Sequence, residues 1–189
     1  MQLWLLRFGY VIVWIRSKGK SWKEKVKMID MDQAAQAIIV EKDGKYLTFK
    51  LADEEYGIGI LKIKEIIGMM PVTSVPRTPH FVKGVINLRG KVIPVIDLRL
   101  KFGMEAIDYT DRTCIIVVEI QGEIGANLIG IVVDSVSEVL NIQNREIEDT
   151  PTLGTNVEAD YILGLAKIEG EVKILLDIDR ILSTREIGI

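Results

Sequence analysis

The sequence has few of the side chains on which catalytic and metal-binding chemistry depends. It holds one cysteine, Cys114, and one histidine, His80, in 189 residues. A single cysteine excludes an intramolecular disulfide, and one histidine without a neighbouring Cys/His cluster does not make a zinc site. Cys114 begins the apolar run 114–118, so we interpret it as an inert core thiol. His80 follows a proline and is interpreted as a structural or loop residue.

Catalytic motifs are also missing. The sequence contains no Gly-x-Ser-x-Gly elbow, no P-loop and no complete dinucleotide-binding fingerprint. Asp177 and Asp179 stand at the start of a predicted short helix, where helix capping explains them. Asp108 and Asp111 flank a turn, which is a common place for aspartate. We therefore expect a binding protein rather than an enzyme, with no catalytic residue, metal or cofactor.

The charge balance argues against one class of partner. The formal net charge is -3 and the sequence pI is near 5.4. Nucleic-acid binding over a whole surface usually needs a basic field, so we expect no nucleic-acid partner. Hydrophobic residues make up 48% of the chain and the mean hydropathy is +0.23, enough for a folded core.

The first 27 residues differ from the rest. They hold all three tryptophans and seven Lys or Arg residues against one acidic residue. The apolar stretch Leu3–Ile15 would span only ~20 Å as a helix, short of the ~30 Å hydrocarbon core. Three interpretations stay open: a membrane-surface or partner-binding segment, an added element that packs on the domain or on another subunit, or an extension upstream of a true start at Met28 or Met31. We favour the third.

Short strands dominate the remainder. Alternation and Gly/Pro punctuation predict strands at 45–51, 56–60, 72–75, 84–88, 92–96, 112–120, 128–133, 163–168 and 172–176. The isoleucines from Ile60 to Ile67 predict a short helix ending at Gly68, and 177–183 predicts a terminal helix. Pro94 predicts an edge strand or a bulge.

Two motifs recur in the same order. The segment Gly84–Leu98 aligns without a gap with Gly164–Ile178, both as G-x5-G-x-V-x4-D followed by an aliphatic residue. Upstream, Gly57–Ile67 aligns with Gly130–Leu140. The repeat predicts an all-β protein of two similar barrel-like units, each with its own strand–turn–strand and glycine-cornered hairpin, packed together as one domain.

Longer runs within 45–183 resemble the CheW family of bacterial chemotaxis coupling proteins. The segments that carry the resemblance are 55–66, 75–99, 130–140 and Tyr161 with the second hairpin, and the most specific is Gly84–Arg99. The resemblance implies two SH3-like five-stranded β-barrels with short connecting and C-terminal helices. It places the domain at 45–185, with a division near 90–110 between two intertwined subdomains, and leaves 1–44 as an N-terminal extension.

The family role implied is that of a cytoplasmic scaffold. Such proteins bind the regulatory domain of the histidine kinase CheA and the cytoplasmic tip of methyl-accepting chemotaxis receptors, so that receptor state controls kinase activity. Membrane association is then only indirect, through receptor arrays. Three rivals remain: a regulatory fragment of the kinase or of a longer adaptor, a small-molecule enzyme on a barrel scaffold, and an adaptor anchored to the membrane through 1–27.

By the same resemblance we expect partner-binding residues around a groove between the barrels. A helical receptor tip needs an apolar groove with a few polar anchors, and Arg89 at a hairpin corner is the best anchor candidate. The alternative for the apolar members is plain core, and for Arg89 a solvated turn residue. The expected receptor- or kinase-binding residues are Ile63, Glu65, Val85, Asn87, Leu88, Arg89, Val136 and Val139.

Overall fold

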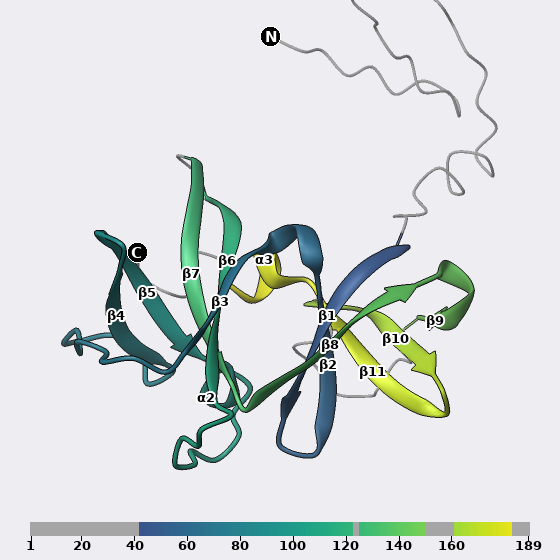
Figure 1. Ribbon diagram of the computed structural model, residues 1–189, viewed down its shortest axis with the longest axis horizontal. Helices are drawn as coiled ribbons and strands as arrows, with labels where there is room; N and C mark the ends of the chain where they lie inside the picture. The colour runs from purple at the N-terminus through teal and green to yellow at the C-terminus, as the bar shows by residue number, and fades with distance from the viewer. Residues whose placement is uncertain (1–41, 123–124, 150–160, 183–189) are drawn as a thin grey trace, which may run out of the picture. The chain divides into compact units, whose positions relative to one another are not determined.

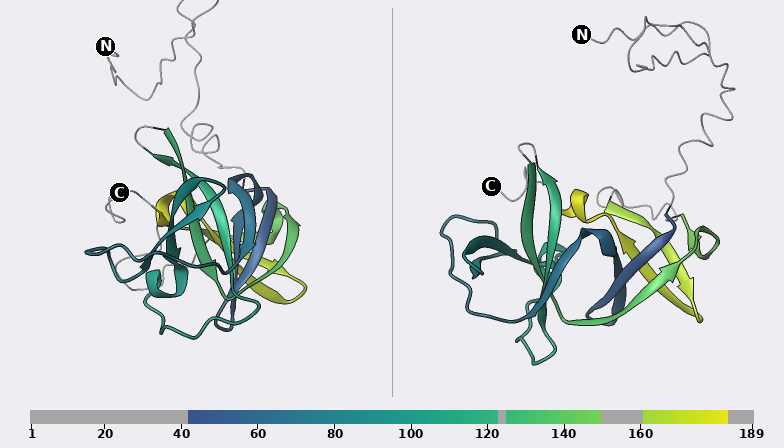
Figure 2. Two further views of the ribbon diagram at one scale, coloured as in Figure 1. Left: turned by 60° about the vertical axis from the view of Figure 1, so that its left-hand side comes forward. Right: turned by 45° about the horizontal axis from the view of Figure 1, so that its top comes forward.

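The fold is built almost entirely from β-strands in two sheets. A computed structural model describes residues 42–122, 125–149 and 161–182, so the predictions for the N-terminal extension lie outside the described residues. The first sheet has the strand order β8-β1-β2-β11-β10-β9 and the second has the order β3-β6-β7-β5-β4. The sheets lie side by side in Figures 1 and 2. Because the described elements are mostly strands of these two sheets, the all-β prediction is confirmed.

The elements have the following bounds. The first sheet contains β1 (Gly44–Leu51), β2 (Glu54–Gly59), β8 (Ser135–Ile142), β9 (Ile147–Glu148), β10 (Ile162–Ile168) and β11 (Glu171–Leu176). The second contains β3 (Ile63–Gly68), β4 (Val82–Leu88), β5 (Lys91–Asp97), β6 (Cys114–Gly122) and β7 (Gly125–Val133). The described residues also contain four short helices, of which the last follows the final strand: η1 (Ile60–Lys62), α2 (Leu98–Lys101), η2 (Asn144–Glu146) and α3 (Ile178–Ile181).

The two repeats exchange their N-terminal hairpins. The β1–β2 hairpin of the first repeat pairs with β8 and β11 of the second, and β6–β7 of the second repeat pairs with β3 and β5 of the first. The two exchanged contacts with β11 and β5 are parallel, at Leu176 with Ile58 and at Ile96 with Ile131. The expectation that each half keeps its own strand–turn–strand is therefore wrong. Both halves contain the same motif, so either hairpin satisfies either sheet.

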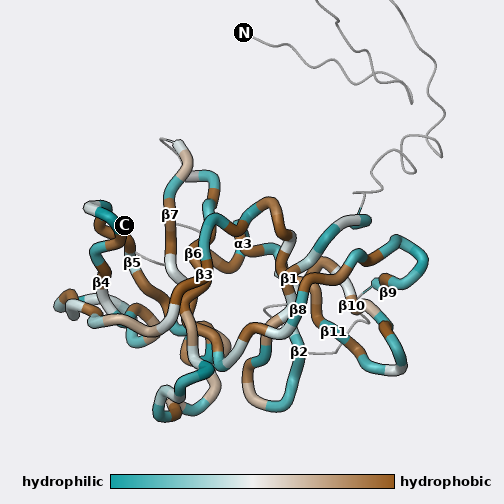
Figure 3. The backbone as a smooth tube through the Cα atoms, in the orientation of Figure 1, coloured by the Kyte–Doolittle hydropathy of each residue, from teal (hydrophilic) through white to brown (hydrophobic). Residues whose placement is uncertain are grey.

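The described residues form three apolar clusters, one between the sheets and one within each sheet. One lies within the second sheet and includes Ile115 and Val117 of β6. A larger one contains Ile116 and Val118 of the same strand together with residues of β1, β2 and α3, so it lies between the sheets. A third lies within the first sheet, around Tyr46. Because alternate side chains of β6 enter different clusters, this strand is buried on both faces, which explains its unbroken apolar run (Figure 3).

The aligned hairpins β4–β5 and β10–β11 have the same backbone. Their turns place Arg89 and Gly90 at φ 52° and 84°, and Glu169 and Gly170 at φ 53° and 88°. Two successive positive φ values are typical of a type I′ turn, the form that matches strand twist. Each hairpin then ends in an aspartate that caps a short helix: the Asp97 side chain accepts from the backbone of Arg99, as Asp177 does from Asp179.

One local prediction is wrong and another is correct only in part. The segment 60–68 is not a helix: η1 ends at Lys62 and β3 begins at Ile63. Its burial alternates residue by residue and it pairs with β6, so tertiary pairing of β-branched side chains overrides the helical spacing. The edge-strand alternative for Pro94 is wrong, because β5 runs between β7 and β4, whereas a register shift does interrupt the β4–β5 ladder opposite the neighbouring Val95 and Ile96. The ladder of β5 with β7 starts only at Val95, so the missing amide donor is tolerated.

The first sheet contains a charged pair where the second sheet has apolar residues. Lys173 lies opposite Glu55 across β11 and β2, and its ammonium contacts both Glu55 and Glu171. By the repeat alignment the equivalent positions are Ile93 and Leu128, which belong to the apolar cluster of the second sheet. The hydrogen bond from Lys173 lowers the pKa of Glu55. Burial acts against the charged form of Lys173, but its bonds to Glu55 and Glu171 outweigh burial and raise its pKa.

Gly84→Ala is expected to disrupt the second sheet. Gly84 has a φ of 138°, and a Cβ there would lie 2.1 Å from the carbonyl oxygen of Thr73, which is hydrogen-bonded to Val85. We expect a loss of more than about 3 kcal/mol in the free energy of unfolding by urea denaturation. Gly90→Ala is the matched control, since its φ is also positive but its Cβ would meet open space; it should cost about 1–2 kcal/mol. Equal losses would contradict the steric argument.

Removing one partner of the Lys173–Glu55 pair should destabilise the first sheet. Lys173→Met leaves the mostly buried Glu55 with only the exposed Lys50 ammonium, 3.9 Å away, as a cation and should cost about 2–4 kcal/mol at pH 7. The double variant Glu55→Leu/Lys173→Ile copies the equivalent apolar pair and should lie within about 1 kcal/mol of the wild type. A double variant no more stable than Lys173→Met would show that the site cannot accept the apolar pair.

The same pair predicts a pH dependence. The lowered pKa of Glu55 adds stability above its unfolded value of about 4.3, which is lost as pH falls through the lower folded pKa. The raised pKa of Lys173 adds stability below about 10.4, which is lost as pH rises through the higher folded pKa. Urea denaturation as a function of pH should show both losses in the wild type and smaller losses in the double variant, in which other groups such as Tyr109 still titrate.

Candidate protein-binding site

An ion pair joins the two edge strands of the second sheet. Arg89, at the tip of the β4–β5 hairpin, donates from Nη2 to Oε1 of Glu65 on β3 over 2.5 Å. The Arg89 side chain is 78% exposed and that of Glu65 is 27% exposed. The strands β3 and β4 are the opposite edges of the sheet. A bond between Glu65 and the hairpin tip at the end of β4 therefore requires the sheet to curl until these edges are close together. It also orients a solvent-facing guanidinium whose other N–H groups can bind a partner.

Other predicted residues support this hairpin. The exposed Asn87 accepts a hydrogen bond from the backbone N–H of Gly90 through Oδ1, over 2.9 Å, and so braces the turn that presents Arg89. Leu88 is half-buried and packs on the cluster within the second sheet rather than on the one between the sheets. Val85 lies opposite Pro94 and bridges to Thr73 through two backbone hydrogen bonds.

Ile63 and Val136 occupy equivalent positions of the repeat. Ile63 begins β3 and Val136 lies near the start of β8, and each strand forms an edge of its sheet. Both side chains are partly buried against the cluster between the sheets. The structure thus brings these two together in one core, as it brings Glu65 to Arg89.

The remaining predicted residue, Val139, is exposed. Its side chain is 49% exposed on β8, where it pairs with Leu47. Two exposed apolar residues in the part of the first repeat that aligns with β8 and the residue before it were not predicted as binding residues. Ile66 on β3 is 43% exposed and Leu61 in η1 is 91% exposed. Ile66 is the repeat equivalent of Val139, so the alignment contained the signal that would have identified it. We call Ile66 and Val139, together with Leu61 just before the edge strand β3, the edge-strand apolar residues.

In the described part of the chain, the side chains that could take part in metal binding or catalysis have the following surroundings. No group of His, Cys, Asp or Glu there could hold a metal ion. Asp177 is engaged as a helix cap, as predicted, and the ring of His80 lies 3.3 Å from the carbonyl oxygen of Leu100. Burial raises the pKa of the Cys114 thiol, which disfavours the nucleophilic thiolate.

No described helix is long and apolar enough to cross a membrane.

Comparison with known proteins places this geometry in a family. A family model described as a CheW-like domain matches residues 45–186. The chain belongs to the CheW family. A CheW chemotaxis protein of Klebsiella aerogenes is 41% identical over 145 residues, which cover 77% of this chain and 85% of the relative. The family resemblance inferred from the motifs is therefore confirmed.

More distant CheW relatives cover a similar range. The chemotaxis protein CheW of Bacillus subtilis is 32% identical over 134 residues, covering 71% of this chain and 81% of the relative. The protein FrzA of Myxococcus xanthus is 30% identical over 157 residues, covering 82% and 93%. Among solved structures, the scaffolding protein TtCheW from Thermoanaerobacter tengcongensis aligns with a TM-score of 0.66 at 35% identity, covering 75% of this chain and 93% of that one.

Arg89→Ala should leave this CheW-family fold intact. The ion pair with Glu65 is largely exposed, and such pairs contribute little to stability, so we expect a change below about 1 kcal/mol in the free energy of unfolding. Urea denaturation followed by circular dichroism measures it. A larger loss would mean that Arg89 is a structural residue of the sheet, and the variant would then be unsuitable for binding experiments.

Proposed function

We propose that this chain is a cytoplasmic scaffold that couples methyl-accepting chemotaxis receptors to the histidine kinase CheA. The family and the names of its relatives support a role in chemotaxis. The observation that carries the proposal is the Glu65–Arg89 pair, because it holds an exposed guanidinium in a fixed direction. A preorganised cation of this kind loses little freedom when it binds a partner carboxylate.

The edge-strand apolar residues provide the second part of the surface. A receptor tip is a helical hairpin, and an amphipathic helix binds through apolar anchors spaced along one face. Ile66 and Val139 lie on edge strands, next to the partly buried Ile63 and Val136. We assign the receptor contact to Ile66 and Val139 on these strands. Arg89, expected from the sequence to anchor the receptor, is assigned with Glu65 to a polar contact with the regulatory domain of CheA, because its hairpin packs through Leu88 on the cluster within the second sheet. Receptor state then acts on the kinase through one folded body.

The central test is reconstitution of the three-part complex. Immobilised CheA regulatory domain and receptor cytoplasmic fragment are each incubated with the full chain, and the retained protein is quantified. We expect the wild type to bind both and to make kinase phosphorylation depend on the receptor fragment. If folded wild type binds neither partner, the coupling proposal fails.

Matched variants separate the two contacts. Val139→Asp should weaken receptor binding by about tenfold or more, while Val172→Asp, at a valine of similar exposure on β11, should not. Arg89→Ala and Glu65→Arg should weaken kinase binding, and Lys91→Ala, at the neighbouring cation of the same hairpin, is the control. Loss of receptor binding by Arg89→Ala alone would reverse the assignment of the contacts.

A further inference from the structure

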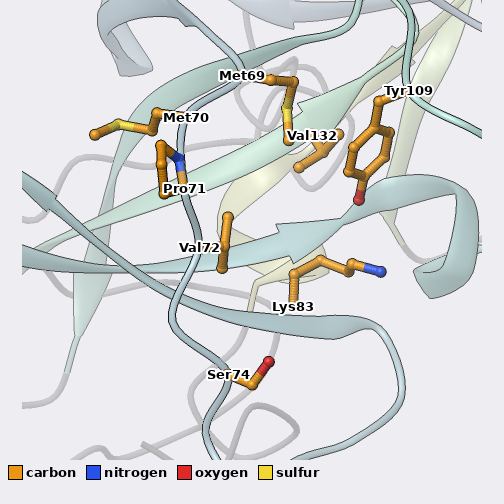
Figure 4. Close-up of a pocket in the computed structure, with 8 residues that line it drawn as sticks. All are labelled: Met69, Met70, Pro71, Val72, Ser74, Lys83, Tyr109 and Val132. Carbon is orange, nitrogen blue, oxygen red and sulfur yellow. The ribbon is translucent and has the colours of Figure 1, made fainter.

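The second sheet has a cavity at one end that the proposed scaffold function does not use. Its volume is about 470 Å³ and it is open to solvent on one side; the segment 69–74, β4, β7 and Tyr109 line it (Figure 4). Met69, Val72 and Val132 supply apolar walls. Ser74, Lys83 and the Tyr109 hydroxyl supply polar groups to the same space. This size and mixture are typical of a small-molecule site, for which the usual range is about 300–1,000 Å³.

The cavity lies where the two repeats differ. Lys83 is equivalent to Leu163, which packs on the apolar cluster of the first sheet. Val132, in the wall, lies opposite Ile115 on β6, as its repeat equivalent Gly59 lies opposite Tyr46 on β1. Tyr46 with Gly59 in the first sheet thus corresponds to Ile115 with Val132 in the second. The change in chemistry is at Lys83, where a lysine replaces a core leucine although the surrounding strands are the same.

The charge of Lys83 has no counter-ion in the described part of the chain. Its ammonium lies 5.8 Å from the centroid of the Tyr109 ring, and none of the described carboxylates lies within ion-pair distance. The nearby Asp97 is already engaged, because it caps α2 and accepts a hydrogen bond from the Tyr109 hydroxyl over 3.2 Å. A cation beside apolar walls is a recognition element for an anion with an apolar body.

Tyr109 is compatible with an anionic ligand. Burial, the charge of Asp97 and the hydrogen bond to it raise the pKa of Tyr109 to about 12. The phenol therefore stays neutral at physiological pH and adds no negative charge to the cavity. Its ring contributes an aromatic wall next to the ammonium.

We propose that this cavity binds a small carboxylic acid with an aromatic or branched aliphatic body. The carboxylate pairs with the Lys83 ammonium and accepts a hydrogen bond from the Ser74 hydroxyl. The apolar body packs on Met69, Val72 and Val132. The site is separate from the Glu65–Arg89 pair and from the edge-strand apolar residues, so it stands or falls independently of the scaffold function.

The test uses the full chain with 3-phenylpropionate as the probe and 3-phenylpropanol as its neutral counterpart. Methyl NMR titration should show saturable shifts of the Val72 and Val132 methyl groups, with a dissociation constant of about 1 mM or tighter. The alcohol should bind at least about tenfold more weakly, because it lacks the charge. No saturation by the acid, or equal binding of the acid and the alcohol, would overturn the proposal.

Two variants connect the binding to the cavity. Lys83→Met keeps the apolar stem and removes the charge, so it should weaken 3-phenylpropionate by about tenfold or more without changing the alcohol. Lys91→Met removes an exposed cation on the hairpin turn and should leave both unchanged. If Lys83→Met does not fold, Ser74→Ala still tests the site through a smaller loss. Equal affinity in the wild type and all folded variants would show that the acid binds elsewhere.

Discussion

The exchange of hairpins between the two sheets is the constraint on which the rest of the structure depends. The link η1 carries the chain out of the first sheet into the second, and the junction of β7 and β8 carries it back. Neither sheet can therefore be completed from one repeat alone. The apolar cluster between the sheets takes residues from both exchanged hairpins, including Phe49 and Ile131. Each ~60–70-residue half would bury too little surface by itself, and the exchange merges the two halves into one core.

Each crossing is held by an ion pair to a short helix, and the helix residues of the two pairs, Arg99 and Asp179, are equivalent in the repeat but opposite in charge. Arg99 of α2 binds Asp134 at the junction of β7 and β8 over 2.6 Å. Asp179 of α3, the repeat equivalent of Arg99, binds Lys62 of η1 over 2.5 Å. Asp134 also accepts from the backbone of Ala52. The helix α2 follows β5 of the second sheet and holds Asp134, where the chain leaves that sheet. The helix α3 follows β11 of the first sheet and holds η1, where the chain leaves the first sheet. The helix side chain is basic in the first pair and acidic in the second. These ion pairs limit how far β3 and β8 can shift, and both strands hold proposed binding residues.

Sequence patterns were reliable where local chemistry decides the structure. The turns at Arg89 and Glu169 and the cap at Asp177 follow from glycine, turn and capping preferences within a few residues. The strand β3 was missed because isoleucines spaced three and four apart also fit a helix, and only pairing with β6 decides between the two. The repeat alone could not predict the exchange, since a motif present twice does not say which copy pairs with which sheet; only the family resemblance implied intertwined subdomains. Glu65 and Arg89 were both named, but their contact spans 24 positions and depends on the curl of the sheet.

The duplication keeps the backbone and varies the chemistry. The paired hairpins have matching burial patterns, and both place a valine, Val92 or Val172, on the surface. Their turns nevertheless present Arg89 in one repeat and Glu169 in the other, and the two tips lie at opposite ends of the paired sheets in Figure 1. Most apolar positions that serve the shared core stay alike, with Lys173 in place of the equivalent Ile93 as an exception, whereas outward positions are freer to diverge. One chain can thus present two different surfaces on one repeated frame, which is what the proposed coupling of two unlike partners requires.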